Sequence, residues 1–294
     1  MDREKVIRAG KIASEVREYA RGFIIKGMPL IEIANKIEEK MASYGEEVKP
    51  SFPTCLSVNH LAAHGTPSYD DERIAEGLLK VDMGVHLDGW ISDTAFSIDL
   101  ENSEENKKII QASEKALECA ISTIKKGVEV GNIGKAVQGA IESLGFNPIV
   151  NLCGHQIKHY ELHSDISIPN FDNKNSTEIP EGLFAIEPFA TPGLGKVKDG
   201  QDSGIYILID GKTPRSDLAR EVLAFIAEEY QTLPFCSRWI VKKFGSKALL
   251  ALRQLVENGN LHSYPELMEA SGENVAQTEH TILVERDKIT VTTK

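Results

Sequence analysis

The chain has 294 residues, of which 41% are hydrophobic and 26% are charged, a composition typical of a soluble globular protein with one large domain or two ordinary ones. Its 44 acidic and 33 basic side chains give a net charge of −11, which argues against broad electrostatic binding to nucleic acid or to an anionic membrane. No apolar run approaches the roughly 18 residues that span a bilayer. The four cysteines are widely spaced, which favours a reducing cytoplasm over a disulfide framework.

The first two predicted helices cover residues 3–25 and 30–44. The second stops at Gly45, a plausible C-terminal cap. About one hundred residues later the pattern returns, because residues 26–45 align without gaps to residues 126–145. The identities are Lys26/Lys126, Gly27/Gly127, Ile33/Ile133, Ser43/Ser143 and Gly45/Gly145. The helices alone are weak support for a repeat, since any two amphipathic helices that end in glycine look alike.

The predicted strands that follow strengthen the repeat. The segment EGLLKVDMGV aligns with EGLFAIEPFA, which matches Asp82 with Glu187. The segment ISDTAFSIDL resembles TEHTILVERD, and we take Asp93 and Glu279 as the matched acids there. Each half of the chain is therefore predicted to supply two carboxylates from two strands.

The first two acids lie on a predicted β-hairpin. If residues 86–89 form its loop, Asp82 faces Asp93 across the hairpin. Directly opposed residues have Cβ atoms roughly 5 Å apart. Two carboxylates at that distance repel, so one stays protonated unless a cation lies between them. A pair of surface aspartates on an exposed face is the alternative, and the hairpin alone does not decide between them.

The second half favours a metal site. Glu187 and Glu279 lie in apolar strand contexts, where a lone buried glutamate is rare. Four acids near a two-fold axis carry a combined charge of about −4, which two divalent cations would balance. Carboxylates with one or two imidazoles suit Mn²⁺, Fe²⁺, Co²⁺ or Zn²⁺. Two such ions about 3.5–4 Å apart can hold a bridging hydroxide and polarise a carbonyl group.

Three of the eight histidines are candidates for the same site. His155 is the strongest candidate ligand, because Gly154 before it allows a close approach of the backbone. His64 and His163 suit roles that face a substrate. A structural or solvent-facing role is the default for the others, which are His60, His86, His159 and His262, and for His280, which should point away from its neighbour Glu279.

The spacing between the paired acids is 11 residues in the first half and 92 in the second, so the second half holds an insertion. Residues 214–272 fit this insertion, with helices near residues 218–230 and 247–257 and a hairpin-like turn at Tyr264-Pro265. The pattern resembles a winged helix that reads DNA. However, seven basic and seven acidic residues give the insertion no electrostatic footprint for DNA, so a role in packing or substrate gating is favoured.

Several segments together resemble type 2 methionine aminopeptidases. They are SFPT, NHLAAHGTP, KVDMGVHLDGWISDTAF, NLCGHQIKHYELH, FAIEPFAT, TLPFCSRW, YPEL and AQTEHTILVE. The match runs in order over nearly the whole chain and includes the insertion that separates type 2 from type 1. The compact length is similar to that of the archaeal members.

The resemblance implies an α/β (α+β) pita-bread fold with internal pseudo-two-fold symmetry. The catalytic domain would comprise residues 1–213 plus 273–294. Residues 214–272 would form an inserted helical, winged-helix-like subdomain.

The resemblance also implies two divalent metal ions, drawn from Co, Mn, Fe and Zn. Their ligands would be Asp82, Asp93, His155, Glu187 and Glu279. Asp93 and Glu279 would bridge both ions, Asp82 would hold one ion, and His155 with Glu187 would hold the other.

The remaining site residues implied by the resemblance face the substrate. His64 matches the histidine that fumagillin-type epoxides attack, and His163 matches the histidine that steadies the scissile carbonyl. The implied methionine pocket is formed by Phe52, Leu162, Tyr264 and Leu267. One departure is Thr278, where the family commonly has an aromatic residue.

The implied activity is that of a cytoplasmic metalloaminopeptidase that removes the initiator methionine when the second residue is small. A hydroxide that bridges the two ions would attack the carbonyl. Glu187 would shuttle the proton, and His163 would stabilise the oxyanion together with the ions. We expect the N-termini of nascent polypeptides as partners, and we expect the chain to be a monomer. We expect no binding to a membrane and no direct role with nucleic acid, and association with the ribosome is left open.

Two alternative functions fit the same fold. A prolidase or an aminopeptidase P uses the same ligands on X-Pro bonds, but these enzymes usually carry a separate N-terminal domain, and here the repeat begins within the first ten residues. A non-enzymatic pita-bread protein would bind ribosomes or nucleic acid. The complete ligand set and the acidic charge argue against that second alternative.

Overall fold

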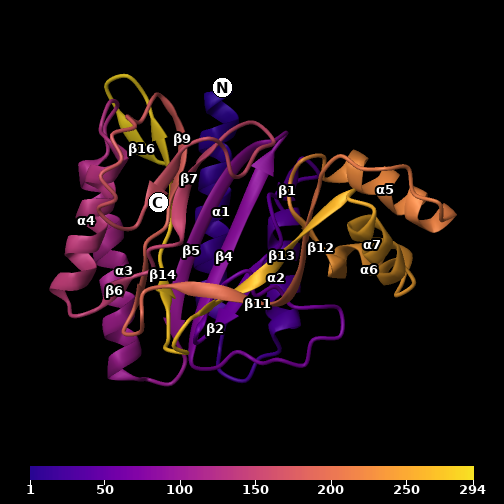
Figure 1. The fold of residues 1–294 in the computed structure, drawn as a ribbon, viewed down its shortest axis with the longest axis horizontal. Helices are drawn as coiled ribbons and strands as arrows, with labels where there is room; N and C mark the ends of the chain where they lie inside the picture. Colours follow the sequence, from indigo (N-terminus) through magenta and orange to yellow (C-terminus); the bar gives the residue numbers. More distant parts are fainter.

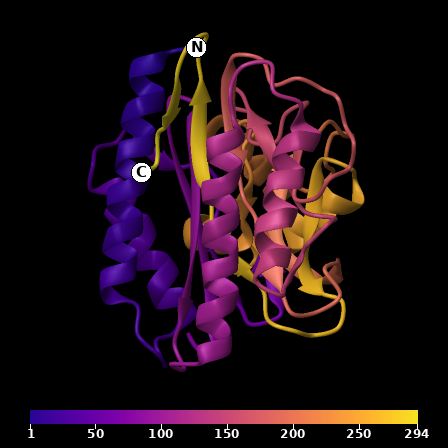
Figure 2. The ribbon, with the colours of Figure 1, turned by 90° about the vertical axis from the view of Figure 1, so that its left-hand side faces the viewer.

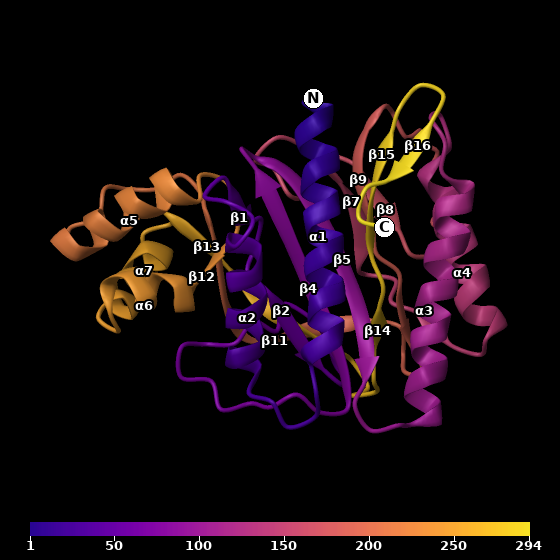
Figure 3. The ribbon, with the colours of Figure 1, turned by 180° about the vertical axis from the view of Figure 1, so that it is seen from behind.

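The computed structural model describes residues 1–294, and Figure 1 shows strands backed by helices, with a separate helical cluster at one end. The helices are α1 (Arg3–Phe23), α2 (Leu30–Ala42), α3 (Glu104–Thr123), α4 (Val130–Ser143), α5 (Asp217–Glu229), α6 (Ser237–Phe244) and α7 (Ala248–Glu257). None of them is both long enough and apolar enough to span a membrane. Helices α1 to α4 cover one face of the strands, whereas α5 to α7 project from the end (Figures 2 and 3).

The sixteen strands form four sheets. The strands are β1 (Val48–Pro50), β2 (Cys55–Val58), β3 (Leu61–Ala63), β4 (Leu78–Leu87), β5 (Trp90–Asp99), β6 (Asn147–Pro148), β7 (Cys153–Ile157), β8 (Ser167–Pro169), β9 (Gly182–Ile186), β10 (Phe189–Thr191), β11 (Val197–Leu208), β12 (Phe235–Cys236), β13 (Leu261–Glu269), β14 (Ala276–Gln277), β15 (His280–Val284) and β16 (Ile289–Val291). Strand β4 pairs with β1, β2 and β5 in the first half. The second half has the order β16-β15-β9-β7-β8, and two smaller sheets have the orders β12-β11-β13-β3 and β14-β10-β6.

The predicted repeat is present in the helices. The α1–α2 pair recurs as α3–α4, and both first helices begin with a side-chain cap, because Asp2 accepts the backbone N–H of Lys5 and Ser103 accepts that of Asn106. Glycines in the left-handed region follow both second helices, at Gly45 and Gly145. The helix pairs therefore begin and end by the same physical devices in both halves.

Each helix pair buries one face of its own sheet. In the first half, Val81 and Met83 of β4 pack in a core with residues of α1 and α2. Side chains alternate along a strand, so Asp82 points to the opposite face, away from the helices. In the second half, Phe184 and Ile186 of β9 pack with α3 and α4 in the same way. The helix layer thus leaves the far face of both sheets for the polar residues.

The hairpin β4–β5 has a tighter turn than the predicted loop of residues 86–89. Only Asp88 and Gly89 form the turn, both with positive φ (49° and 77°), which is the geometry of a type I′ turn. A Cβ on Gly89 would lie 2.1 Å from the Tyr160 ring, so only glycine fits. The expected pairing of Asp82 with Asp93 is therefore wrong. The shift is two residues, which keeps both carboxylates on one face as diagonal neighbours.

A seam of hydrogen bonds joins the two halves where β5 meets the chain around β15. The Glu279 backbone N–H donates to the carbonyl of Ala95 at 3.0 Å. The Thr281 hydroxyl donates to the carbonyl of Asp93 at 2.7 Å and accepts the Asp93 backbone N–H at 2.8 Å. The Thr94 hydroxyl donates to the Glu279 carbonyl at 2.9 Å. The seam thus fixes Asp93 relative to Glu279 through backbone atoms.

The inserted region contains the two predicted helices, α5 and α7, and a third, α6, that the sequence analysis missed. These helices share an apolar core with residues of β11 to β13. The predicted turn at Tyr264-Pro265 is wrong, because both residues lie inside β13, which pairs with β11 through two register shifts. Strand β13 also pairs with β3. The division into residues 1–213 plus 273–294 and an inserted subdomain of residues 214–272 stays a prediction.

Candidate metal centre

The five predicted ligands come from five segments that meet at one cavity of about 310 Å³. Asp82 lies in β4 and Asp93 in β5. His155 lies in β7, Glu187 directly follows β9, and Glu279 directly precedes β15. The two strand pairs of the repeat and the neighbouring strand β7 thus contribute side chains to the same space.

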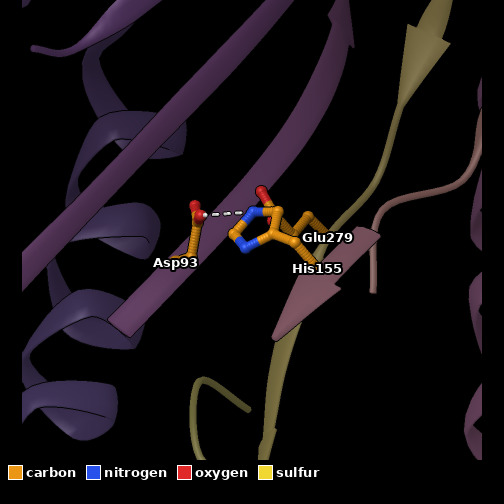
Figure 4. Close-up of side chains that lie close together, drawn as sticks. All are labelled: Asp93, His155 and Glu279. Carbon is orange, nitrogen blue, oxygen red and sulfur yellow. Dashed lines mark ion pairs between the residues drawn. The ribbon is translucent and has the colours of Figure 1, made fainter. Parts of the chain in front are cut away.

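Short distances link these groups. His155 Nε2 lies 3.6 Å from Asp93 Oδ2 and 3.6 Å from Glu187 Oε1. Asp93, His155 and Glu279 each offer a ligand atom within 4.8 Å of the other two. Figure 4 shows these three side chains pointing toward one another from β5, β7 and the segment before β15. The spacing leaves room for an ion between the donors.

Two of the four carboxylates are fully buried, and none has a lysine or arginine partner. Asp93 is 4% exposed and Glu279 is 1% exposed. No lysine or arginine forms an ion pair with any of the four acids, and His155 is their basic neighbour. Four buried polar atoms have no hydrogen-bond partner in the protein; they are Asp82 Oδ1, Asp93 Oδ1, His155 Nδ1 and Glu279 Oε2. Leaving buried polar atoms unpaired costs free energy, and a cation bound by these oxygen and nitrogen atoms would offset that cost.

The pKa directions agree with a cation site. Burial raises the pKa of Asp82 to about 7, and burial with the charge of neighbouring carboxylates raises the pKa of Glu187 and Glu279 well above the usual range. Burial and the charge of His163 lower the pKa of His155, which keeps its imidazole neutral. Neutral imidazole and carboxylate oxygens are the donors that divalent transition metals prefer. The cluster therefore fits a divalent metal ion.

Gly154 explains why β7 brings His155 so close. Strands β7 and β9 pair with His155 opposite Ala185. A Cβ on Gly154 would lie 2.3 Å from the Ala185 carbonyl oxygen, so any other residue would push the strands apart. The close approach expected from the sequence is present, and its cause is strand pairing.

The two histidines expected to face the substrate lie at the same cavity. His64 has a positive φ of 65°, and its Nδ1 lies 2.9 Å from the Pro265 carbonyl oxygen, which fixes the ring. The His163 ring lines the cavity and packs edge-on against His155, with 4.4 Å between ring centroids. Burial by surrounding protein and the charge of His64 lower the pKa of His163 to about 4. Burial also lowers the pKa of His64, so both imidazoles are neutral at neutral pH.

The predicted methionine-pocket residues also line this cavity, namely Phe52, Leu162, Tyr264 and Leu267. Phe52 and Leu162 are buried in an apolar cluster, whereas Tyr264 and Leu267 come from β13 on the facing sheet. The Tyr264 ring packs edge-on against His64 at 5.6 Å. An apolar wall thus stands beside the carboxylate cluster.

Gln277 is a site residue that the sequence analysis missed. It is 1% exposed, and its Nε2 lies 3.5 Å from Asp82 Oδ2 and 3.4 Å from Glu187 Oε2. Its backbone is held by Ser97, whose hydroxyl both accepts the N–H and donates to the carbonyl. The amide therefore bridges one carboxylate from each half. A polar residue two positions before Glu279, on the same face of an extended segment, was the available signal.

The remaining expectations concern residues near Glu279. His280 points away from the acids, as expected, and its Nδ1 contacts Thr293 Oγ1 at 2.9 Å and Arg17 Nη1 at 3.2 Å. Thr278, where an aromatic residue was expected, shares a hydrogen bond of 2.7 Å with Ser113 of α3. The threonine thus ties this segment to the helix layer.

Comparison with known proteins places the chain in a family. The sequence model of metallopeptidase family M24 matches residues 4–286. The chain is 46% identical to a methionine aminopeptidase of Pyrococcus horikoshii over the whole of both chains, and 43% identical to one of Methanothermobacter thermautotrophicus over 99% of this chain and 98% of that one. A solved methionine aminopeptidase of Thermotoga maritima superposes with a TM-score of 0.71 at 24% identity, covering 99% of this chain and 96% of that one. That likeness supports the pita-bread fold. The chain therefore belongs to metallopeptidase family M24 and, within it, to the methionine aminopeptidases.

Proposed function

We propose that the chain removes the N-terminal methionine of nascent polypeptides whose second residue is small, with two divalent ions held at the candidate metal centre. The observation that carries this proposal is a cluster of four carboxylates, two of them buried and none paired with a lysine or arginine, beside an apolar wall in one cavity. The ligands would be Asp82, Asp93, His155, Glu187 and Glu279. Divalent ions at such a centre lower the pKa of water and polarise a carbonyl group.

Glu187 is the residue that moves a proton in this proposal. Its carboxylate lies in the cavity and would take up the proton that the attacking water releases. His155 Nε2 lies 3.6 Å from its Oε1, and the Gln277 amide lies 3.4 Å from its Oε2. These neighbours support the side chain in one orientation. Glu187 would pass the proton to the leaving amine.

His163 and His64 position the scissile bond. Because the pKa of His163 is lowered to about 4, its ring is a neutral donor that can stabilise a developing oxyanion without adding charge. His64 Nδ1 lies beside the Pro265 carbonyl oxygen, so Nδ1 of the neutral ring would carry the proton and donate to that oxygen. Nε2 would then be free to accept a hydrogen bond. His163 would therefore donate a hydrogen bond to the oxyanion, and His64 would accept a hydrogen bond from the substrate.

The apolar wall selects the side chain of the first residue. An unbranched thioether adapts to a slot formed by Phe52, Leu162, Tyr264 and Leu267. Methylene-scale differences in such a pocket are worth about 1–3 kcal/mol, so discrimination against leucine is finite. The second residue would pass close to His64 and His163, which line the same cavity, and this would favour small side chains.

The cellular setting belongs to the same proposal. A substrate that is a nascent chain implies work in the cytoplasm, close to the ribosome. All four cysteines are free thiols, which agrees with a reducing compartment. We propose that the chain acts there as a monomer, and association with the ribosome remains part of the proposal.

A peptide panel with added Mn²⁺ or Co²⁺, read by mass spectrometry, tests this function. We expect rapid cleavage of Met-Ala, Met-Gly and Met-Ser peptides and poor cleavage of Met-Lys and Met-Glu peptides. An N-acetylated Met-Ala peptide is the matched control and should remain intact, because its nitrogen no longer carries a free amine. Preferred cleavage of X-Pro peptides, whatever X is, would instead assign the chain a prolidase activity.

A further inference from the structure

A second cavity, of about 270 Å³, lies where the inserted helices meet the body of the protein. Its walls come from α2, β1, β4, α5 and α6. None of the candidate metal ligands or substrate-facing histidines lines it. The cavity is therefore separate from the candidate metal centre, and the proposed function does not use it.

His86 presents an unused hydrogen-bond donor to this cavity. The residue is 6% exposed, and its Nδ1 accepts the backbone N–H of Gly89 at 3.1 Å. Burial and the charge of Lys49 lower the pKa of His86 to about 4, so the ring is neutral and its proton must sit on Nε2. Nε2 has no hydrogen-bond partner in the protein, and it is not fully buried. A ligand that offers an oxygen acceptor would satisfy it.

Most charges around the cavity are already neutralised inside the protein. Lys49 pairs with Glu229 at 2.7 Å. Glu38 accepts Arg238 at 2.7 Å and 2.9 Å and also accepts the indole N–H of Trp239 at 2.8 Å. These internal pairs leave no net charge for a ligand to balance.

Two opposite charges remain free at the cavity. Glu39 of α2 and Lys242 of α6 line it, and neither forms an ion pair or a side-chain hydrogen bond. Together with the His86 donor, they complement a ligand that has both a carboxylate and an ammonium group. A singly charged ligand would leave one of the two charges unused.

The rest of the wall is aromatic and aliphatic. The rings of Tyr230 and Trp239 stack with 5.6 Å between centroids and an angle of 26°. Leu233 and Pro50 complete the apolar side. An apolar side chain of a ligand would be removed from water against this surface.

We propose that this cavity is a second binding site, for a free α-amino acid with an apolar side chain. The carboxylate of the ligand accepts from His86 Nε2 and Lys242, its ammonium group pairs with Glu39, and its side chain packs on Trp239 and Leu233. A zwitterion with one apolar arm matches the unpaired groups one for one.

The site shares a wall with the methionine pocket. Pro50 and Leu233 line the second cavity, whereas Phe52 and Pro234 line the candidate metal centre. A ligand in the second cavity would therefore contact the two segments that form one side of the methionine pocket. That consequence rests on the proposed function, whereas binding at the second site does not.

Fluorescence of Trp239 tests the binding directly. The chain has two tryptophans, so a Trp90→Phe variant leaves Trp239 as the single reporter. L-Norleucine is the probe, because it carries both charged groups and an apolar arm. We expect a saturable change in emission, which L-norleucine methyl ester and N-acetyl-L-norleucine do not reproduce. Lys242→Ala and Glu39→Gln should each raise the dissociation constant about tenfold, because each removes a charge-assisted contact.

Leu267→Ala is the matched control, since it alters the methionine pocket and should leave the Trp239 response unchanged. A response that is lost in Leu267→Ala but kept in Lys242→Ala and Glu39→Gln would place the ligand in the other cavity and overturn the proposal. A flat titration of the metal-free and metal-loaded protein would also overturn it. Because the readout is emission and not hydrolysis, a failed peptide panel leaves this test intact.

Discussion

The two halves of the repeat reach the same cavity by different routes. In the first half, Asp82 and Asp93 lie on one hairpin, joined by a two-residue turn. In the second half, Glu187 and Glu279 adjoin β9 and β15, which are far apart in sequence but paired in space. The strand framework is therefore repeated, whereas the way in which each half fixes its acids is not.

The register shows that the side chains are not matched one for one. Val81 pairs with Phe96 in the first half, whereas its counterpart Ile186 pairs with His280 in the second. Counted from these pairs, Glu279 occupies the place of Ala95 and Gln277 occupies the place of Asp93. The match of Asp93 with Glu279 expected from the sequence is therefore wrong by two residues. A repeat preserves backbone pairing more strictly than the chemistry of each position.

The largest effect should follow from removing an acid of the hairpin. Asp93→Ala deletes the carboxylate that faces His155 and Glu279, so we expect peptide hydrolysis to fall below detection and the bound metal to decrease. Metal analysis and kcat/KM measure the two effects. Asp88→Ala, in the turn of the same hairpin, is the matched control and should keep both. Hydrolysis by Asp93→Ala at the parental rate would refute the assigned centre.

A smaller effect should follow from removing the Gln277 amide, which occupies in the second half the place that Asp93 has in the first. Gln277→Ala removes the donor that bridges Asp82 and Glu187, which lets both carboxylates rotate. Loss of such a supporting contact typically weakens metal affinity about 10–100-fold. Competition with a chelator measures the affinity, and Gln201→Ala, on the surface, serves as the control. Unchanged affinity in Gln277→Ala would show that the bridge does not support the ligands.

The second half also makes a pH prediction for the metal-free protein. The pKa of Glu279 is raised in the folded state by burial and by neighbouring carboxylates. Between the unfolded and folded pKa values, only the unfolded state releases the proton, so the parent loses stability as pH rises. Glu279→Gln lacks this loss. Its advantage in free energy of unfolding should therefore be larger at pH 8 than at pH 5, as measured by urea denaturation with chelator. A constant difference would contradict the raised pKa.

The smallest expected effect concerns the seam that sets the register of the second half. Thr281→Val removes a hydroxyl that donates to and accepts from the Asp93 backbone, leaving buried groups unpaired at a cost of about 1–3 kcal/mol. Thr290→Val is the matched control, because the Thr290 hydroxyl is buried without a partner and its loss should cost nothing. Equal destabilisation by both changes would mean that the seam is not what holds the halves together.

The sequence predicted the features that depend on local patterns. Helical periodicity located α1 and α2, the repeat located α4, and apolar strand contexts identified Glu187 and Glu279 as unusual. Features set by partners far along the chain were not predicted. Tyr264 and Pro265 resemble a turn locally, but pairing with β11 draws them into a strand.

The turn of the first hairpin was missed for a different reason. The pair Asp88-Gly89 carries the strongest short-range signal for a two-residue turn, and the longer loop of residues 86–89 ignored it. Gln277 was missed because its position two residues before Glu279 was its one signal, and an uncharged amide does not by itself indicate a metal site. Only the folded positions of Asp82 and Glu187 show what it contacts.

Calorimetric titration of the chelator-treated protein with Mn²⁺, compared with Asp82→Asn, tests most directly whether acids from both halves build one centre. We expect two ions for each parent chain and one for Asp82→Asn, because the ligands on β7 and in the second half remain. Retention of two ions by Asp82→Asn, or no binding by the parent, would contradict this expectation.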